Sequence, residues 1–355
     1  MLIIARSADS INLIGRCPHA GAAQREHIVM AGHLIGRRAS FATAAAGVLA
    51  MPALAQGQDF PNRAVRIIVP SPAGGPTDAV ARLVAPMMSE GWSYPMVIEN
   101  RVGASGAVGS QAVARATPDG HTLLVNASMH AIIPSIMPNL PYNTLTDFTP
   151  VALLATGPYV LVAHPSLGVS TLAELIALAK ARPGTLNYAS PGNGTGNHFA
   201  TELLRARAGI DLVHVPYPGA APATTDVVGG QVPLMLNNMI SAVPHIQAGR
   251  LRALGVTSPQ RSPALPDVPT FAETLPGFEA ITWYGMFGPA NLPIAIRNEF
   301  NRRANDAGRT DQVKQRLAAL GVDPVNASSE QLGHFVASEM TKWAEVARIS
   351  GAKVD

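Results

Sequence analysis

The sequence predicts an α/β protein of two lobes, each a mainly parallel sheet flanked by helices. Three observations support this fold class. After residue 55, short β-branched runs alternate with runs whose apolar residues recur at helical spacing. This alternation starts again near Tyr159, and no repeat of short fixed period indicates a solenoid. With 355 residues, 47% hydrophobic and 14% charged, the chain is long enough for about two domains and too apolar to be disordered.

The first series of elements is predicted to be β-α-β-α-β. Strands are expected at 65–70, 96–99 and 122–126, each followed by a turn rich in glycine or other small residues. Thr77 and Asp78 are predicted to cap the first helix, and the second helix is expected to run to Arg115. Such a series predicts parallel strands joined by right-handed crossovers.

The second series begins with a strand at 159–163. Thr171 and Glu174 form a capping-box sequence that opens a helix ending at 182–184. The later predicted elements are a strand near 187–189, a glycine-rich turn at 190–197, a helix to Ala208, a strand at 213–216, a turn and helix at 219–228, and strands near 234–236 and 253–257.

The C-terminal segment 328–349 predicts an amphipathic helix. Ser328 and Gln331 form a capping box, and one apolar stripe follows them at helical spacing. We expect this helix to pack back onto the first lobe. The predicted lobes are therefore 56–158 with 283–355, and 159–282.

The first 55 residues predict a secretory signal peptide. Arg37 and Arg38 precede a short apolar run, and Ala53 and Ala55 supply a small-residue site, so cleavage is expected after about Ala55. A membrane anchor is the alternative, but it needs about 20 apolar residues. The arginine pair is compatible with twin-arginine export as well as general secretion.

The excess of basic charge lies in this leader. Five of the 26 basic and two of the 23 acidic residues fall in positions 1–55, so positions 56–355 carry 21 of each. The net charge of +3 therefore does not indicate a nucleic-acid partner. Cys17, the one cysteine, also lies there. Met30 would begin a leader of ordinary length, so we interpret 1–29 as a start assigned too early.

The sequence does not indicate an enzyme or a cofactor. The turn 192–196 lacks the dinucleotide fingerprint, and 103–107 misses the final glycine of a hydrolase elbow. No residues suggest a nucleophile with its base. The histidines after residue 55 are scattered, which favours structural roles over metal ligation; they are His121, His130, His164, His198, His214, His245 and His334.

Four glycine-rich turns between a strand and a helix are the repeated chemical feature. They lie at 71–78, 102–109, 190–198 and 217–222. Free backbone N–H groups at a helix N-terminus favour an anion, and glycine lets a ligand approach closely. In open α/β sheets ligands bind at the carboxyl ends of the strands. Two such pairs on two lobes predict an anion-binding cleft.

From about Phe60 onward the chain resembles the solute-binding receptors of tripartite tricarboxylate transporters, the Bug family of periplasmic binding proteins. The matching stretches, in order, are FPNRAVRIIVP (60–70), AGGPTD (73–78), ENRVGASG (99–106), PDGHTLL (118–124), LPYNTLTDFTP (140–150), VPYPGAAPA (215–223), GGQV (229–232) and RSPALPDVPT (261–270).

The resemblance implies a Venus-flytrap receptor in the periplasm that closes around a small carboxylate. Its partners would be the large and small membrane subunits of the transporter, and we expect a monomer without cofactor or metal. A periplasmic carboxylate sensor, or an enzyme on the same fold, is the alternative. The implied ligand-binding residues are Ser71, Ala73, Gly74, Gly75, Thr77, Asp78, Ser105, Ser128, Gly194, Thr195, His198, Tyr217, Gly219 and Asn237.

Several of these positions allow two interpretations. Asp78 caps a helix, which we favour, or contacts the ligand. His198 orients the glycine turn or contacts the ligand. Asn237 stands where many relatives carry a pocket aspartate, which predicts a ligand without an ammonium group unless it is a structural amide.

The two first-lobe turns also depart from the family pattern. Pro76 replaces a glycine or serine and removes one N–H donor. Val102 and Ser105 stand where proline and glycine are common.

Overall fold

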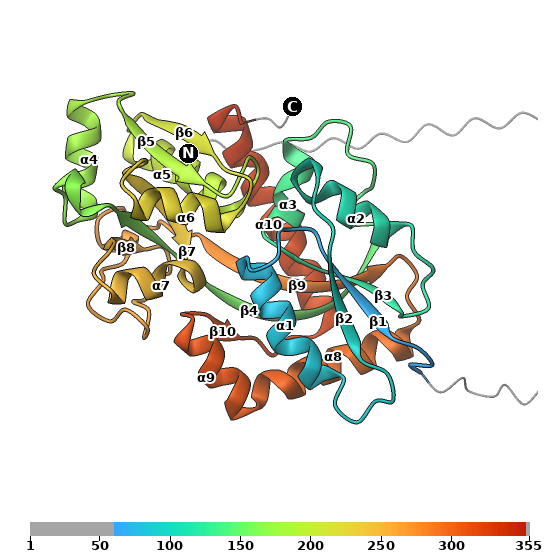
Figure 1. Ribbon diagram of the computed structural model, residues 1–355. Helices are drawn as coiled ribbons and strands as arrows, with labels where there is room; N and C mark the ends of the chain where they lie inside the picture. The colour runs from blue at the N-terminus through green and yellow to red at the C-terminus, as the bar shows by residue number, and fades with distance from the viewer. Residues whose placement is uncertain (1–59, 353–355) are drawn as a thin grey trace, which may run out of the picture. The chain divides into compact units, whose positions relative to one another are not determined.

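Strands and helices alternate along residues 60–352, the part of the chain that the computed structural model describes (Figure 1). The predicted leader, its cleavage site, Cys17 and Met30 lie outside these residues. The elements are β1 (Val65–Val69), α1 (Pro76–Met88), β2 (Met96–Asn100), α2 (Ala107–Ala114), β3 (Thr122–Ala127), α3 (Met129–Ile132), β4 (Phe148–Ala163), α4 (Leu172–Ala181), β5 (Leu186–Ser190), α5 (Gly196–Ala208), β6 (Leu212–Pro216), α6 (Ala220–Val228), β7 (Leu234–Asn238), α7 (Met239–Gln247), β8 (Arg252–Val256), β9 (Ile281–Pro289), α8 (Ile294–Arg309), α9 (Asp311–Ala319), β10 (Asp323–Pro324) and α10 (Ser329–Ser350).

The strands form two parallel sets joined by antiparallel strands. Their order is β2-β1-β3-β9-β4-β7-β5-β6, with β8 and β10 also paired to β4. β2, β1 and β3 are parallel, and so are β7, β5 and β6. The predicted two-lobe α/β fold is confirmed in this arrangement. The antiparallel strands β9 and β4, which join the two sets, add a feature that the predicted parallel series did not include.

The long strand β4 belongs to both halves of the sheet. Residues up to Pro158 pair with β9, and those from Tyr159 pair with β7 and β8. The sequence-predicted lobe boundary at 158/159 falls at this change of partner, and the second boundary falls within β9. The lobe limits themselves stay a prediction.

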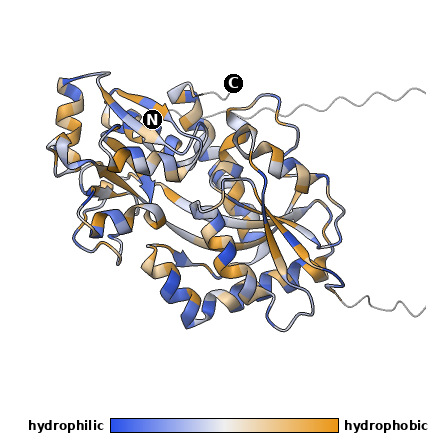
Figure 2. Ribbon diagram, viewed as in Figure 1, coloured by the Kyte–Doolittle hydropathy of each residue, from blue (hydrophilic) through white to orange (hydrophobic). Residues whose placement is uncertain are grey.

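The side chains of β1 alternate between two hydrophobic cores, one on each face of the first half of the sheet. Val65, Ile67 and Val69 pack with α1, α8 and α9, whereas Ile68 belongs to the cluster that includes residues of α3 and α10. Successive strand side chains point to opposite faces, so both faces are covered. Hydrophilic residues lie on the outer side of α8 and α9 (Figure 2).

The predicted C-terminal helix is confirmed as α10, with a reciprocal capping box between Ser328 and Gln331. It packs on β4, α3 and α5 and so contacts elements from both halves of the sheet. Within it the buried Glu339 accepts hydrogen bonds from the indole N–H groups of Trp283 (3.2 Å) and Trp343 (2.9 Å), and pairs with Lys342. Burying this carboxylate is tolerated because its oxygens are hydrogen-bonded and paired.

Two capping predictions need correction. α1 begins at Pro76 after the N-cap Gly75, so Thr77 and Asp78 lie inside its first turn. Thr171 does cap α4, but Glu174 accepts from the N–H of Ser170 and not from that of Thr171.

Candidate functional site

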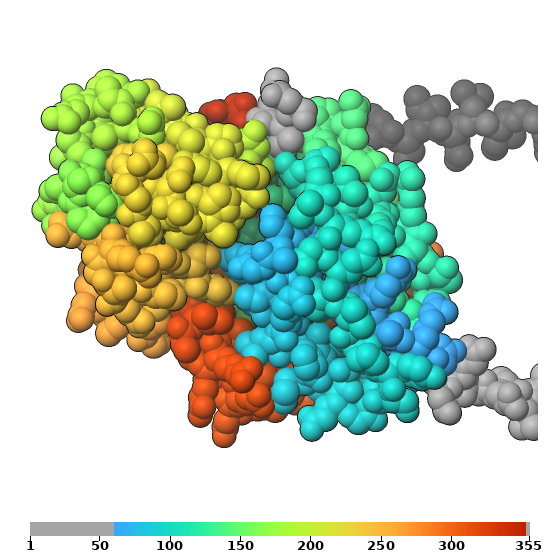
Figure 3. Space-filling view, viewed as in Figure 1, coloured from blue at the N-terminus to red at the C-terminus, as the bar shows by residue number. Residues whose placement is uncertain are grey.

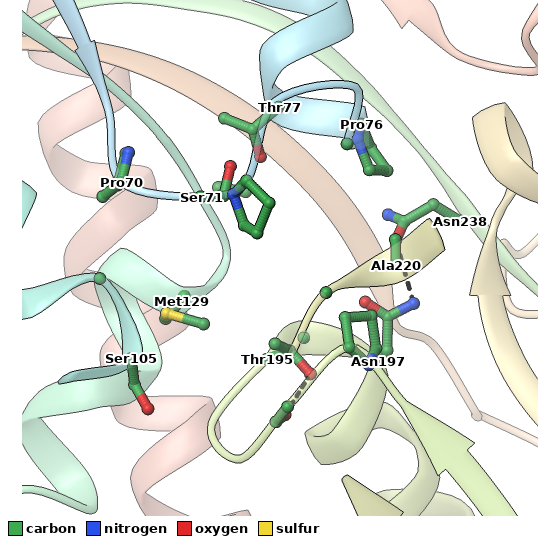
Figure 4. Close-up of a pocket in the computed structure, with 18 of the residues that line it drawn as sticks. Pro70, Ser71, Pro76, Thr77, Ser105, Met129, Thr195, Asn197, Ala220 and Asn238 are labelled. Carbon is green, nitrogen blue, oxygen red and sulfur yellow. Dashed lines mark hydrogen bonds between the residues drawn. The ribbon is translucent and has the colours of Figure 1, made fainter. Parts of the chain in front are cut away.

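A cavity of about 420 Å³ lies where the carboxyl ends of six parallel strands meet (Figure 4). The turns after β1, β2 and β3 approach it from one half of the sheet, and those after β5, β6 and β7 from the other. Tyr159 of β4 and Thr282 and Tyr284 of β9 complete the lining. This position is the one that open α/β sheets generally use for ligands.

Five helices of eight or more residues begin at the cavity. The N-cap residues of α1, α2, α5, α6 and α7 all line it; they are Gly75, Gly106, Thr195, Gly219 and Asn238. Each helix N-terminus carries about half a positive charge on unpaired N–H groups. Among the described lining residues none has a charged side chain. Helix N-termini, and no charged side chain of this lining, therefore favour an anion in the cavity.

Asp78 holds the first turn and does not line the cavity. It is buried and accepts hydrogen bonds from the N–H of Gly74 (2.9 Å), from Arg82 (2.8 Å) and from Asn100 (3.0 Å). Burial by itself would raise the pKa of Asp78, but these hydrogen bonds outweigh it and hold that pKa below its usual value. Asp78 does not cap α1, whose N-cap is Gly75, but its carboxylate is occupied by the turn before that helix and by neighbouring side chains.

The structure brings nine of the sequence-predicted residues to the cavity and leaves five away from it. Those that line it are Ser71, Ala73, Gly75, Thr77, Ser105, Ser128, Thr195, Tyr217 and Gly219. Those that do not are Gly74, Asp78, Gly194, His198 and Asn237. Pro76, the proline that departs from the family pattern, lines the cavity and is the first residue of α1, where a helix does not require an N–H.

His198 lies behind the glycine turn that follows β5. Its ring stacks on that of His214 with centroids 4.0 Å apart, and its Nδ1 accepts from the N–H of Gly194 at 3.3 Å. His214 Nε2 lies 2.6 Å from Ser190 Oγ, at the start of the same turn. The two rings therefore support the turn from behind, as the orienting interpretation of His198 expects.

Asn237 and Asn238 show the effect of strand alternation. Asn237 is fully buried: its amide donates to Thr224 Oγ1 (3.0 Å) and accepts from the N–H of Asn238 (2.8 Å). Asn238, the next residue of β7, faces the cavity and accepts from Asn197 at 3.0 Å. Successive strand residues point to opposite faces, so the sequence prediction was one residue away from the amide that lines the cavity.

Sequence reasoning missed several polar lining residues. They are Asn126, Asn193, Asn197, Asn238, Tyr159, Thr282 and Tyr284. Asn126 and Asn238 stand at the carboxyl ends of β3 and β7, so the rule that ligands bind at strand ends was a usable signal for them. Tyr159, Thr282 and Tyr284 reach the cavity only through the antiparallel strands that join the two halves.

Within residues 60–352 no group of three or more His, Cys, Asp or Glu side chains is placed to hold a metal ion. No helix in that range combines the length and hydropathy needed to cross a bilayer.

The stacked histidines predict a loss of stability in mild acid. Burial lowers the pKa of His198 and of His214 to about 4, against 6.5 for an ordinary histidine. Between these pH values the unfolded chain binds more protons, so the free energy of unfolding decreases as the pH falls from 6.5 to about 4. His198 alone accounts for on the order of 3 kcal/mol. Urea unfolding at pH 7, 5.5 and 4.5 measures the decrease.

Two matched variants test whether His198 causes this pH dependence of the unfolding free energy. We expect H198Q to show a smaller change in unfolding free energy between pH 7 and 4.5 than wild type, and H334Q, at an exposed position, to keep the wild-type change. Part of the dependence will remain in H198Q because the buried His130 also has a pKa lowered to about 3. An unchanged slope in H198Q would contradict the prediction.

Residues 80–351 match the model of the tripartite tricarboxylate transporter family receptor. The chain belongs to this receptor family. The receptor is 39% identical to protein BugT of Bordetella pertussis over 83% of its own length and 91% of that protein. Two solved structures from Rhodopseudomonas palustris are also similar: one described with adipate, at 33% identity and TM-score 0.80 over 83% of the receptor and 99% of that chain, and MatC with bound malate, at 35% identity and TM-score 0.76 over 81% and 99%.

These comparisons confirm three expectations from the sequence. The family resemblance is confirmed, and so is the periplasmic-binding-protein fold, since a solved periplasmic binding protein superposes on the receptor with TM-score 0.78. The protein is a solute-binding receptor and not an enzyme, because its family and its solved relatives are solute-binding receptors.

Proposed function

We propose that this receptor binds a small dicarboxylate without an ammonium group in the periplasm and delivers it to the membrane subunits of a tripartite tricarboxylate-type transporter. The observation that carries the proposal is the convergence of five helix N-termini on a cavity whose described lining has no charged side chain. We further propose that the exported receptor is a monomer cleaved after about Ala55.

An anion is the ligand that this cavity suits. Carboxylate oxygens accept hydrogen bonds from free backbone N–H groups, and the helix dipoles stabilise negative charge. Hydroxyl groups add further donors: Ser71 Oγ is buried, lines the cavity and has no protein hydrogen-bond partner. A buried hydroxyl without a partner costs free energy, so a ligand oxygen or a water is expected beside it.

The apolar part of the lining favours hydrocarbon between the polar ends of the ligand. Six prolines, together with Met129 and Val102, line the cavity; the prolines are Pro70, Pro72, Pro76, Pro191, Pro218 and Pro222. These residues offer carbon surface and no side-chain donor. A chain of methylenes or an aromatic ring fits such walls, and adipate, described with one relative, has that composition.

The described lining offers no negatively charged partner to an ammonium group. Among the described residues around the cavity there is no Asp or Glu, and the nearby carboxylate of Asp78 is already paired with Arg82. An amino acid would bring a positive charge to several positive helix ends. The amide of Asn238, which does face the cavity, supports the same preference that the sequence assigned to Asn237.

A binding screen with matched ligand pairs tests this proposal. We expect adipate, malate, glutarate, succinate or an aromatic dicarboxylate to raise the melting temperature. A ligand at 100 times its dissociation constant adds about 2.7 kcal/mol, which is a shift of several degrees. Isothermal titration then compares glutarate with glutamate and succinate with aspartate, because each pair differs in the ammonium group. Tighter binding of the amino acids would refute the preference, and no shift with any carboxylate would refute the ligand class.

A further inference from the structure

A side-chain hydrogen bond joins two cavity-lining turns that come from opposite halves of the sheet. Ser105 Oγ donates to the backbone carbonyl of Asn193 at 3.2 Å, although the two residues are 88 positions apart in sequence. Ser105 lies in the turn after β2, and Asn193 in the glycine turn after β5. In Figure 4 the Ser105 hydroxyl points toward that turn. Among residues 60–352 no other side-chain hydrogen bond joins these two turns.

The backbone at Ser105 has a conformation that glycine adopts more readily. Ser105 has φ 50° and ψ 40°, and Ala104 before it has φ 44°. This left-handed region is unfavourable for residues with a side chain, and such residues concentrate where function requires them. The flanking Gly103 and Gly106 also have positive φ, so glycine would suit the whole turn. A serine at this position therefore carries a conformational cost that its hydroxyl contact offsets.

A second contact between the same halves lies close by. Pro72, in the turn after β1, approaches Gly219 so closely that a side-chain carbon at Gly219 would lie 3.2 Å from the proline ring. In the space-filling view the blue segment around α1 meets the yellow segment around α6 at the surface (Figure 3). The two halves are thus in contact in this structure, and Ser105 contributes a directed hydrogen bond to that contact.

We propose that Ser105 is a positioning residue that stabilises the closed form of the receptor by donating its hydroxyl to Asn193 across the cavity. In the closed form the hydrogen bond delays separation of the two halves. Its role in retaining a dicarboxylate rests on the proposed function, whereas its role in closure does not.

The test separates the hydrogen bond from the backbone strain. S105A removes the hydroxyl and keeps the unfavourable φ, and S105G removes the hydroxyl and relieves the strain. S89A is the matched control, because Ser89 Oγ donates to a backbone carbonyl, that of Pro86, within one half of the sheet. Spin labels at R115C and T225C, exposed positions at the end of α2 and on α6, report the separation in a full-length C17S background.

In the ligand-free protein the short label distance reports the closed form and the long distance the open form. We expect S105A and S105G each to lower the ratio of the short-distance population to the long-distance population by about two- to tenfold, which is the range for one net hydrogen bond. S89A keeps the wild-type ratio. The melting temperature of S105G is not lower than that of wild type, so a loss of closure in this variant does not come from a weakened fold. The proposal would be overturned if both Ser105 variants had the same distance distribution as wild type. It would also be overturned if the wild-type protein showed no short distance.

Ligand release gives an independent readout. With adipate and malate as probes, we expect the dissociation rate from S105A and S105G to rise by the same factor as the ratio of short to long label distances falls. If neither probe binds wild type, nor any carboxylate of the screen, the proposed function fails, while the label distances still decide the role of Ser105. If the probes bind and leave S105A and S105G at the wild-type rate, Ser105 does not retain the ligand.

Discussion

Replacing Asn238 with aspartate is expected to weaken dicarboxylate binding by about 100-fold. The carboxylate would face the cavity from the N-cap of α7, where Asn238 now lines the wall. Two unit charges about 6 Å apart at an effective dielectric near 20 repel by about 3 kcal/mol, which gives this factor. Isothermal titration of N238D with adipate and malate measures it.

The fold should tolerate N238D because its neighbours can adapt. The Asn238 amide donates to Thr282 Oγ1 (3.2 Å) and Tyr284 Oη (3.4 Å), and hydroxyls can donate as well as accept. Asn197 can continue to donate to the new carboxylate, and an acid at a helix N-terminus is favourable.

N298D provides the control for N238D, since it adds the same charge at an exposed position of α8 and should bind as wild type does. Glutamate and aspartate should lose less affinity for N238D than glutarate and succinate do. Equal dicarboxylate affinity in N238D and N298D would show that the cavity does not hold an anion near Asn238.

Replacing Gly196 with alanine is expected to cost about 2–4 kcal/mol of unfolding free energy and most of the ligand affinity. A methyl group at this first residue of α5 would overlap the hydroxyl of Tyr159 and lie 3.1 Å from Ser128 Cβ. Tyr159 is fully buried and its hydroxyl donates to Ser128 at 3.3 Å, so it cannot move without losing that contact. Overpacking and a lost hydrogen bond together give this range. Thermal unfolding and titration with adipate measure both effects.

Gly229→Ala is the matched control for Gly196→Ala. Gly229 has φ −78°, and the nearest atom to an added methyl group is a backbone oxygen at 3.4 Å, an ordinary contact. We expect its stability to lie within about 0.5 kcal/mol of wild type. If Gly196→Ala were as stable as Gly229→Ala and bound ligand with wild-type affinity, Tyr159 and Ser128 would be able to move aside for the methyl group, and the prediction would be wrong.

Local patterns predicted most of the elements around the site. The strand at 65–70, the glycine turns and the capped helix from Ser328 all follow from neighbouring residues, and the structure contains each of them. β9 was not predicted, because its glycines and final proline are typical of turns. α8 and α9 were missed because polar and charged residues dominate them. Their packing on the sheet, which the local pattern does not reveal, holds them in place.

The same distinction between local sequence patterns and tertiary packing applies to the site residues. The turns that contain Ser71 and Thr195 could be predicted because a parallel sheet places them at its carboxyl edge, whereas Ser71, Thr77 and Thr195 themselves were named from the family resemblance. Asn237 had two interpretations, and its buried hydrogen bonds to Thr224 and Asn238 favour the structural amide, a choice that the local sequence does not make. His198 was ambiguous for another reason: only the stack with His214 shows that it faces the back of the turn.

The sequence by itself determined most strands of the two parallel sets, several helix starts and the glycine-rich turns, since each depends on residues close together in the chain. Only the tertiary structure decided which turns face each other, that Ser105 reaches Asn193, and that Asn238 lines the cavity. These contacts depend on the path of β4 through both halves of the sheet. Such long-range pairing leaves no periodic signal in the residues that it brings together.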